Sequence, residues 1–487
     1  MLTAPDTNLR PNPMRTAVSA FILFLIFLMG MLVLLVPDER DDKMYLGNDA
    51  PSSISTTSTT SNYDNLNNGD TAFMCICCAL VLLMTPGLAF FYGGMVRKNN
   101  LVSTLLQCFV IMGLIMMLWI IIGYSLAFGE DEGRVIGNPK TYFFFRDVGS
   151  DTDGGIPHTI YALFQGTFAI ITPALITGAV AERVNFIALM FFVALWHIIV
   201  YCPLAHMEWH SEGLFHHYGH KDFAGGTVVH MSSGYSALVL ALLIGKRKGE
   251  KETLHQPVHT PYVLLGTALL WFGWFGFNGG SELAADALAA QALITTNVAA
   301  GTSMFTWVVW DYIQGRKISV IGTCGGLVVG LVVITPACAF VTVGAAMVMG
   351  MIGAIISNVA MHIMKENPLV DDTLDVFACH GLGGTVGMIL TALFANAKVY
   401  DPLNESEDDH EGLFYGTGTL LWRTIVIAIC VIAYCMVVTG ALFFIINAFV
   451  NFRVSEEDEQ AGLDPSYHGE LVDMKAQAGG EDGKITA

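Results

Sequence analysis

Long apolar runs separated by short polar loops dominate the chain. A helix needs about 20 apolar residues to cross the hydrocarbon core of a bilayer. One such run lies near residues 17–36, and a polar Ser/Thr/Asn-rich linker follows it. Eleven further runs lie near 71–93, 101–128, 158–180, 186–206, 223–244, 261–281, 286–311, 318–339, 341–364, 375–396 and 418–451. This pattern predicts an all-α polytopic membrane protein with an eleven-helix core and one N-terminal hydrophobic helix.

The chain divides by composition into three segments. Residues 1–69 hold the first hydrophobic run and the linker, residues 70–451 form the membrane core, and residues 452–487 form an acid-rich tail. Arg10 and Arg15 precede the first run, as they would in a signal peptide. The run is long for a signal peptide and lacks a small-x-small cleavage site, which favours an uncleaved anchor. A cleaved signal peptide remains the alternative.

The composition supports a membrane protein. Charged residues make up 13% of the chain and hydrophobic residues 54%, whereas a soluble domain carries about 25% charged residues. The mean hydropathy is +0.57. These values exclude a disordered chain, a nucleic-acid-binding arm and an ordinary soluble enzyme. The net charge of −19 comes from acids clustered in 37–42, 129–154, 401–411 and 452–487.

Lys and Arg in the short loops predict the orientation of the core. If residue 71 starts outside, the inside loops are rich in basic residues, which are Arg97, Lys98, Arg183, Lys246, Arg247, Lys248, Lys251, Arg316, Lys317 and Lys365. The outside loops hold few, diluted among acids. We therefore expect a core with its N-terminus outside and its C-terminus in the cytosol, in the plasma membrane. The sequon at Asn404 then lies in an outside loop and is a glycosylation candidate.

The first ten core spans can be divided into two halves of five. An odd number of spans in each half forces the halves into opposite orientations, which predicts an inverted repeat. The fifth span of the first half opens with Asp222 and carries His230 in DFAGGTVVHMSSG. Its counterpart opens with Asp375 and carries His380 in DVFACHGLGGTVG.

Histidines inside two of these spans are the first candidates for function. Ionisable residues within a membrane are costly and usually functional. A single histidine could simply pack and form a hydrogen bond. Two histidines at matching repeat positions, His230 and His380, instead favour a pore in which imidazoles pass protons or hydrogen-bond a small amine.

A second group of residues is aromatic and lies toward the outside. Phe164 and Phe168 occur in FQGTF, Trp209 in HMEWH on an outside loop, and Phe277 and Ser281 in FNGGS. Aromatic faces attract a cation, and a serine hydroxyl accepts a hydrogen bond from it. The alternative is the ordinary aromatic belt of a membrane protein, which periodicity alone favours.

Two clusters contain residue types that bind metals. The outer loop holds His206, His210, His216, His217 and His220, but their spacing gives no helical ligand pair. The cysteines at 75, 77 and 78 are more typical of small packing residues in a span. We predict no metal site, no cofactor and no nucleic-acid partner. No nucleotide loop or nucleophile–base pair supports an enzyme.

Five motifs together identify a family. They are TPGLAFFYGGMVRKNN (85–100), DFAGGTVVHMSSG (222–234), WFGFNGGS (274–281), DVFACHGLGGTVG (375–387) and RVSEEDEQAGLDPSYHGE (453–470). The chain resembles the ammonium transporter family (Amt/Mep, with the related Rhesus glycoproteins) over about residues 70–475. Trp209 and AGGTVVH favour the Amt/Mep branch. The added N-terminal run departs from the family pattern.

The resemblance implies roles for the pore and the tail. His230 and His380 match the family's twin pore histidines, and Asp222 matches its structural aspartate near the cation site. Ser466 lies where some relatives carry a phosphorylated threonine. The family forms trimers with one pore in each subunit. The implied partners are ammonium or ammonia, methylammonium and membrane lipid.

The resemblance also implies roles for the outer aromatic residues. Phe168, Trp209 and Ser281 match the site that recruits ammonium, with Phe164 beside it. Phe168 and Phe277 match a stacked phenylalanine gate. We expect NH4+ to lose its proton near this gate, and NH3 to cross past the histidines. Two alternatives stay open, namely a sensor that moves little ammonium and a channel for neutral gas.

Overall fold

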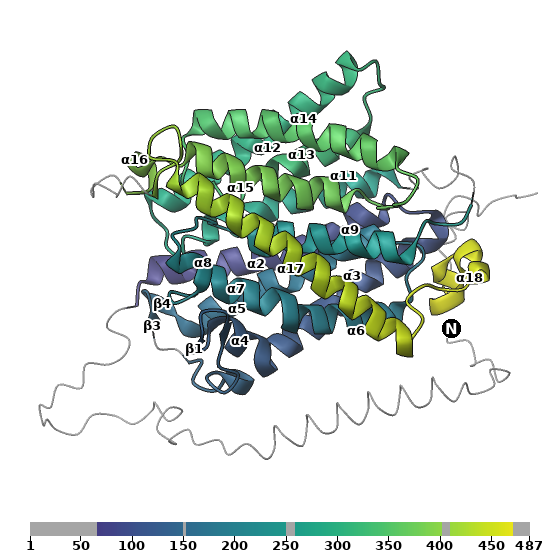
Figure 1. Cartoon of the computed structure of the whole chain (residues 1–487), viewed down its shortest axis with the longest axis horizontal. Coiled ribbons are helices and arrows are strands. Elements are labelled where there is room, and N and C mark those ends of the chain that lie inside the picture. The colour runs from purple at the N-terminus through teal and green to yellow at the C-terminus, as the bar shows by residue number, and fades with distance from the viewer. Residues whose placement is uncertain (1–65, 150–151, 250–258, 402–409, 471–487) are drawn as a thin grey trace, which may run out of the picture. The chain divides into compact units, whose positions relative to one another are not determined.

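The computed structural model describes residues 66–149, 152–249, 259–401 and 410–470. The predicted N-terminal helix, all but the end of the linker that follows it, Asn404 and the end of the tail lie outside these residues. Helices dominate the described part (Figure 1). Its strands form two antiparallel pairs of two residues each. These are β1 (Asp131–Glu132) with β2 (Ile136–Gly137), and β3 (Thr152–Asp153) with β4 (Ile156–Pro157).

The first half of the core contains helices joined by short 3₁₀ and π segments, written η. In chain order they are α2 (Asn68–Gly93), η1 (Lys98–Asn100), α3 (Leu101–Leu118), η2 (Trp119–Gly123), α4 (Tyr124–Phe128), η3 (Phe143–Phe145), α5 (His158–Ile176), η4 (Thr177–Val180), α6 (Phe186–Trp196), η5 (His197–Tyr201), α7 (Cys202–Trp209), α8 (Leu214–His217), η6 (Gly226–Met231) and α9 (Ser232–Ile244).

The second half and the tail continue the pattern. They contain α11 (Thr260–Trp274), η7 (Phe275–Gly279), α12 (Ala287–Ile313), α13 (Val320–Ile334), α14 (Val343–Glu366), η8 (Phe377–Leu382), α15 (Gly383–Phe394), α16 (Ala397–Tyr400), α17 (Thr419–Phe449), α18 (Glu456–Ala461) and η10 (Asp464–His468).

A helix occupies each of the eleven apolar runs predicted in the core. Within the described residues, ten helices are long and apolar enough to cross a membrane. The remaining one, α13, is apolar but shorter than the predicted run 318–339. It ends just before Pro336, whose ring lacks the N–H that would continue the helix. The helix in the run predicted at 186–206 is longer than expected, because it continues to Trp209, and the short helix α8 follows after a four-residue break.

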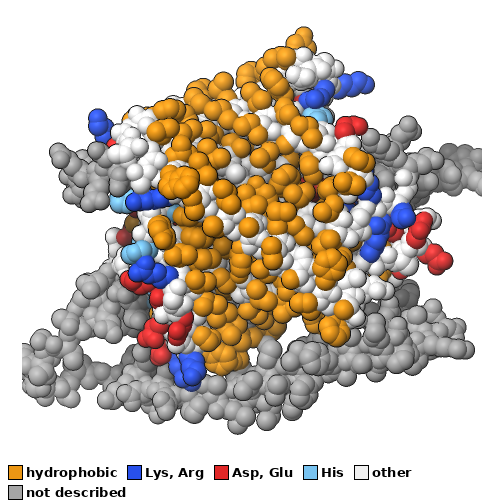
Figure 2. Space-filling view, in the orientation of Figure 1, with side chains coloured by type: hydrophobic (Ala, Val, Ile, Leu, Met, Phe, Trp, Pro, Cys, Tyr) orange, Lys and Arg blue, Asp and Glu red, His pale blue; other side chains and the backbone are white. Residues whose placement is uncertain are grey.

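The surface of the described core is that of a membrane protein. In Figure 1 the long helices run beside one another between two ends of the core. One end, called the loop end, carries β1, β3, β4, α8 and α16, and the other, called the tail end, carries α18. Figure 2 shows hydrophobic side chains filling the face between these ends, with charged side chains gathered at both. Such a band fits a bilayer, which offers no hydrogen bonds to polar groups.

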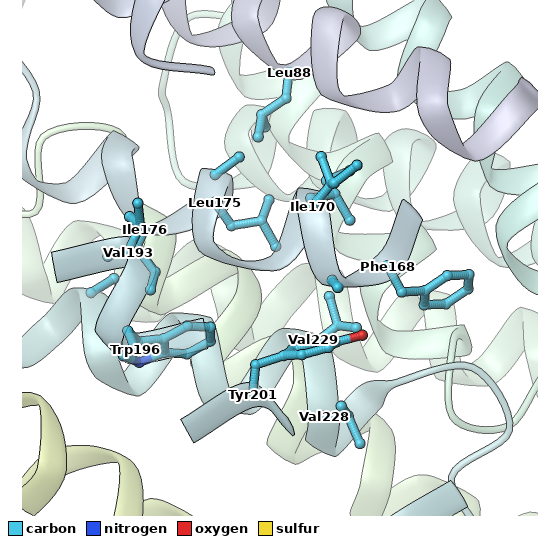
Figure 3. Packing of buried hydrophobic residues seen from close by; sticks show 14 of the residues in the cluster. Leu88, Phe168, Ile170, Leu175, Ile176, Val193, Trp196, Tyr201, Val228 and Val229 are labelled. Atoms are coloured by element: carbon cyan, nitrogen blue, oxygen red, sulfur yellow. The ribbon is translucent and has the colours of Figure 1, made fainter. Parts of the chain in front are cut away.

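The interior is closely packed around two π-helical segments. Apolar side chains that include Phe168, Ile170, Leu175 and Val229 fill the space between α5, α6 and η6 (Figure 3). The segments η6 and η8 begin two of the spans and carry the predicted pore histidines. π segments inside helices are common at functional sites.

Two glycines allow these spans to touch. A Cβ atom built on Gly234 would lie 2.0 Å from the backbone nitrogen of Gly381. No side chain fits at that distance, so the backbones themselves are in contact. Small residues at helix crossings have this role in membranes.

The contact predicts a large difference between two glycine substitutions. We expect Gly234→Ala to destabilise the protein by at least about 2 kcal/mol, because the added methyl must push two helices apart. Gly113 on α3 has no atom within 4 Å of its built Cβ, so Gly113→Ala is the matched control. Thermal unfolding of both purified variants in detergent measures the difference. Equal midpoints for the two would contradict the packing described.

Candidate functional site

The two predicted pore histidines meet in the interior. Nδ1 of His230 on η6 lies 3.2 Å from Nδ1 of His380 on η8. Only 1% of His230 and 4% of His380 is exposed. For two neutral rings, a hydrogen bond between the two Nδ1 atoms requires one nitrogen to carry a proton and the other a lone pair. Two neutral rings in this contact are therefore in different tautomers.

Two aromatic rings from α11 and η7 lie against His230. Trp274 stacks on it with ring centroids 5.6 Å apart, and Phe277 lies at 6.1 Å. The indole N–H of Trp274 donates to the hydroxyl of Thr335 at 2.9 Å, which fixes the ring. Sequence reasoning missed Trp274. Its position three residues before Phe277 puts both rings on one helix face, and this spacing was the available signal.

A small cavity borders the histidine pair. Its volume is about 10 Å³, which is about the room that one water molecule needs. Apart from the two histidines, its lining is apolar, with Leu88, Ile171, Val229, Phe277 and others. The cavity can therefore accept a small neutral molecule, whereas a cation there would lose its hydration with little replacement.

Phe168 and Phe277 form a stacked pair. Their ring centroids are 4.1 Å apart and the ring planes differ by 24°. Both residues are buried, and Phe277 also lines the cavity. The two rings therefore close the cavity on the side of the outer aromatic group.

The outer aromatic residues converge on this pair. Trp209 meets Phe168 edge to face at 5.9 Å, and Phe164 lies 5.0 Å from Phe168. The hydroxyl of Ser281 donates to the carbonyl of Phe277 at 2.9 Å, so its lone pairs can accept from a ligand. Trp209 ends helix α7 instead of lying in a loop as expected, because the helix of this span continues beyond 206.

Asp222 caps the span that carries His230. Its carboxylate accepts the backbone N–H groups of Gly225, Gly226 and Thr227 at 2.6–2.9 Å. The helix dipole also stabilises a negative charge at a helix N-terminus. Its backbone carbonyl accepts the indole N–H of Trp209 at 3.2 Å. Burial, with the nearby Glu208 carboxylate, raises the pKa of Asp222 to about 6. The residue therefore connects the pore helix to the outer aromatic group.

Asp372 is the structural counterpart of Asp222, and sequence reasoning missed it. Each aspartate lies eight residues before a pore histidine. The carboxylate of Asp372 accepts the N–H of Phe377 at 2.7 Å, five residues on, as that of Asp222 accepts the N–H of Thr227. Asp375, which the sequence suggested for this position, instead pairs with Lys365 at 2.9 Å. Aligning the two histidines would have identified Asp372.

Two of the histidines predicted for the outer loop contact carboxylates, and His206 also stacks on His210 with ring centroids 4.4 Å apart. His206 contacts the carboxylate of Asp131 and the carbonyl of Ala127, each at 3.0 Å. His220 lies 2.9 Å from both carboxylate oxygens of Glu208. These contacts hold loops together at the loop end of the core.

The tail docks at the opposite end. The carboxylate of Asp464 accepts the N–H groups of Val102 and Ser103 at the start of α3, at 3.0 and 2.7 Å. Glu459 contacts Arg453 at 2.8 Å. Ser466 is exposed, two residues after the docked aspartate. Its side chain is therefore open to solvent while the tail is docked.

Comparisons with known proteins identify the family of this chain. The Ammonium Transporter Family matches residues 72–472. The chain is 42% identical to an ammonium transporter of Bacillus subtilis over 405 residues, which cover 82% of this chain and 98% of the relative. It is 41% identical to ammonium transporter 1 of Schizosaccharomyces pombe over 413 residues, with 83% and 82% covered.

Solved structures share the fold. The crystal structure of Saccharomyces cerevisiae Mep2 has a TM-score of 0.75 at 33% identity, covering 82% of this chain and 90% of that one. A protein described as a sensor Amt protein has a TM-score of 0.75 at 26% identity, covering 82% and 98%. The family contains transporters and not enzymes. By sequence, by fold and by the motifs around its paired histidines, the chain belongs to the ammonium transporter family.

Proposed function

We propose that this ammonium transporter binds NH4+ at its outer aromatic site, removes the proton near the phenylalanine gate and conducts NH3 past His230 and His380 into the cytosol. The observation that carries the proposal is the cavity beside the two histidines. It is apolar, has room for about one water-sized molecule and is closed by Phe277. Ammonia matches these properties and ammonium does not.

The outer site supports binding of the cation. Phe168 and Trp209 present aromatic surface, each worth about 0.5–2 kcal/mol to a cation depending on its desolvation. Ser281 offers lone pairs, and Phe164 completes the aromatic surroundings. Asp222 has no carboxylate oxygen left without an N–H partner, so it acts through its charge and by fixing the local structure.

Deprotonation separates ammonium from potassium. The two cations have similar size and charge, so a site that recognises charge alone cannot distinguish them. Moving either through an apolar pore would cost several kcal/mol or more. Only ammonium can give up a proton and cross as a neutral molecule. The hydrogen-bonded histidine pair offers the released proton a separate route, which would make transport electrogenic.

The surrounding organisation follows from the same proposal. We infer a core of residues 70–451 in the plasma membrane, with the loop end outside and the tail, residues 452–487, in the cytosol. Asn404 would then be open to glycosylation. We also infer a homotrimer in contact with membrane lipid, with methylammonium as a second substrate. Residues 1–69 would form an N-terminal anchor or a cleaved signal with its linker.

A sensor is the second candidate function. The structural neighbour described as a sensor Amt protein shares the fold, and the same outer site would serve a receptor. The amount of ammonium moved by each subunit distinguishes the two functions.

Ion currents test the proposed mechanism. An ammonium pulse on liposomes containing the purified protein should give a transient current, whereas potassium and sodium pulses should give none. The double variant His230→Ala, His380→Ala should lose this selectivity and pass potassium, because the proton route is removed and the pore widens.

Two results would contradict this mechanism. Ammonia flux without current, measured with a pH-sensitive dye, would indicate a neutral gas channel. A double variant that kept full current and still excluded potassium would exclude the histidine route. Protein-free liposomes give the background leak for both measurements.

Substitution of Trp209 tests the outer site. Trp209→Leu should raise the KM for ammonium by about twofold to thirtyfold, the range that corresponds to one cation–π contact. The maximal rate should change little, because the pore is intact. Trp422→Leu is the matched control, since Trp422 on α17 is 68% exposed and is not in ring contact with Phe168 as Trp209 is. An unchanged KM for Trp209→Leu would exclude a recruitment role.

Ser466→Asp tests regulation by the tail. A phosphate on Ser466 would add about −1.5 to −2 charge beside Asp464 in an already acidic tail, and this repulsion would weaken docking of the tail. The carboxylate of Ser466→Asp adds a smaller negative charge at the same place, so it should also weaken docking. We expect faster hydrogen exchange in residues 456–470 and a change in transport rate of about twofold or more, with Ser466→Ala unchanged. Faster exchange at an unaltered transport rate would exclude regulation through this serine.

A further inference from the structure

The segment His220–Phe223 leads directly into η6, which carries His230. Each residue of this segment contacts other parts of the protein. His220 contacts Glu208 at 2.9 Å, and both side chains are buried. Asp222 caps η6 and accepts the indole N–H of Trp209. The N–H of Phe223 donates to the carbonyl of Pro336 at 3.1 Å. Lys221 is the residue whose contacts have no role in the mechanism so far.

The ammonium group of Lys221 lies between two aromatic rings. Its Nζ is 4.1 Å from the centroid of Tyr400 and 4.9 Å from that of Phe340. Both distances are within the range of about 6 Å in which a ring attracts a cation. The two rings stand nearly perpendicular at 80°, with centroids 5.5 Å apart, and so form two walls of a cage.

The cage belongs to the second half of the chain and is itself fixed. The carbonyl of Phe340 accepts the N–H of Asn396 at 2.9 Å. The Tyr400 hydroxyl donates to the carbonyl of His410 at 3.1 Å. Phe340 also meets Phe223 edge to face at 5.5 Å. Lys221 and Phe223 therefore attach a first-half segment to a rigid second-half surface.

The buried position of Lys221 disfavours the charged form of its amino group. Burial lowers the pKa of Lys221 to about 8, and the negative charge of Asp401 offsets part of that effect. A surface lysine avoids this cost by extending into water. Here the partly buried group remains mostly charged at neutral pH, and the ring faces supply attraction in place of water.

We propose that Lys221 is a positioning residue for the ammonium-recruitment site: its caged ammonium group fixes the 220–223 segment, and through the carbonyl of Asp222 it fixes the indole of Trp209. The cage surrounds the alkylammonium group of Lys221, which has the positive charge and the N–H donors that ammonium also has.

The proposal rests on the recruitment role proposed above for Trp209, and transport kinetics test both. Lys221→Met keeps an unbranched stem of four heavy atoms and removes the charged amino group that lies between the rings. We expect a KM for ammonium about threefold to tenfold higher, with a maximal rate within about twofold of the unaltered protein. Lys221→Arg keeps the contact between cation and rings and should restore most of the affinity.

Lys398→Met is the matched control for charge. Lys398 lies on α16, two residues from Tyr400, and is exposed. Lys398→Met removes one positive charge from the same end of the protein, as Lys221→Met does, but leaves the cage around Lys221 intact. If Lys221 acted only by repelling the incoming cation, both variants would lower the KM. Positioning predicts a rise for Lys221→Met alone.

A double-mutant cycle isolates the cage. Tyr400→Leu removes one wall, and Tyr400→Phe keeps the ring without its hydroxyl. The KM of Lys221→Met, Tyr400→Leu should be no higher than that of the worse single variant, because both remove one interaction. Tyr400→Phe should stay close to the unaltered protein.

The outcomes separate the two proposals. A raised KM for Trp209→Leu but not for Lys221→Met would overturn the positioning role alone. An unchanged KM for Trp209→Leu would overturn the recruitment role on which it rests. A fall in maximal rate at constant KM for Lys221→Met, or multiplicative effects in the cycle, would also overturn the positioning role.

Discussion

The direct contact between two helix backbones is the constraint on which the rest of the site depends. Gly234 and Gly381 bring the spans of His230 and His380 so close that the imidazoles share a hydrogen bond. With any side chain at this crossing the helices would separate, and the rings would have to find other partners in a medium that supplies none. The histidine pair is therefore a result of packing.

The charges near the pore lie at the ends of its helices and not along the cavity. Asp222 and Asp372 each accept backbone N–H groups at the start of a span, where a negative charge is stabilised by the helix dipole. Neither lines the cavity beside the histidines. An acid in the cavity would stabilise any monovalent cation, whereas the apolar lining penalises all of them equally. Selectivity in the proposed mechanism then comes from the chemistry of the ion and not from its size.

The loop end joins the two halves through aromatic rings. Phe168 and Phe277 come from different halves, as do Phe223 and Phe340. The same ring chemistry that suits a transported cation also holds Lys221. Rigid rings tolerate partial dehydration better than carboxylates do, because they need no hydrogen bonds on their faces. A site built from them keeps its shape when a small ion arrives or leaves.

The sequence by itself determined the class of fold, the eleven apolar runs and the motifs that carry the family. The reason is that a bilayer imposes length and hydropathy on each span separately, so these properties are local. The histidines also stood out, because ionisable residues in spans are rare. The sequence pattern failed to predict features that depend on contacts between distant segments of the chain. It placed Trp209 in a loop, chose Asp375 over Asp372, and gave no reason to notice Lys221. The spacing of Trp274 and Phe277 puts both rings on one helix face, but it does not show that they lie against His230.

Only the tertiary structure decided which of these residues meet. Three contacts join segments that are far apart in sequence. They are the contact between His230 and His380, the stacking of Trp274 on His230, and the cage around Lys221. Such contacts depend on helix rotation and on close approach at glycines, which hydropathy does not encode. A bilayer constrains the length and hydropathy of each span separately, but the histidine pair and its cavity arise from how the spans pack against one another.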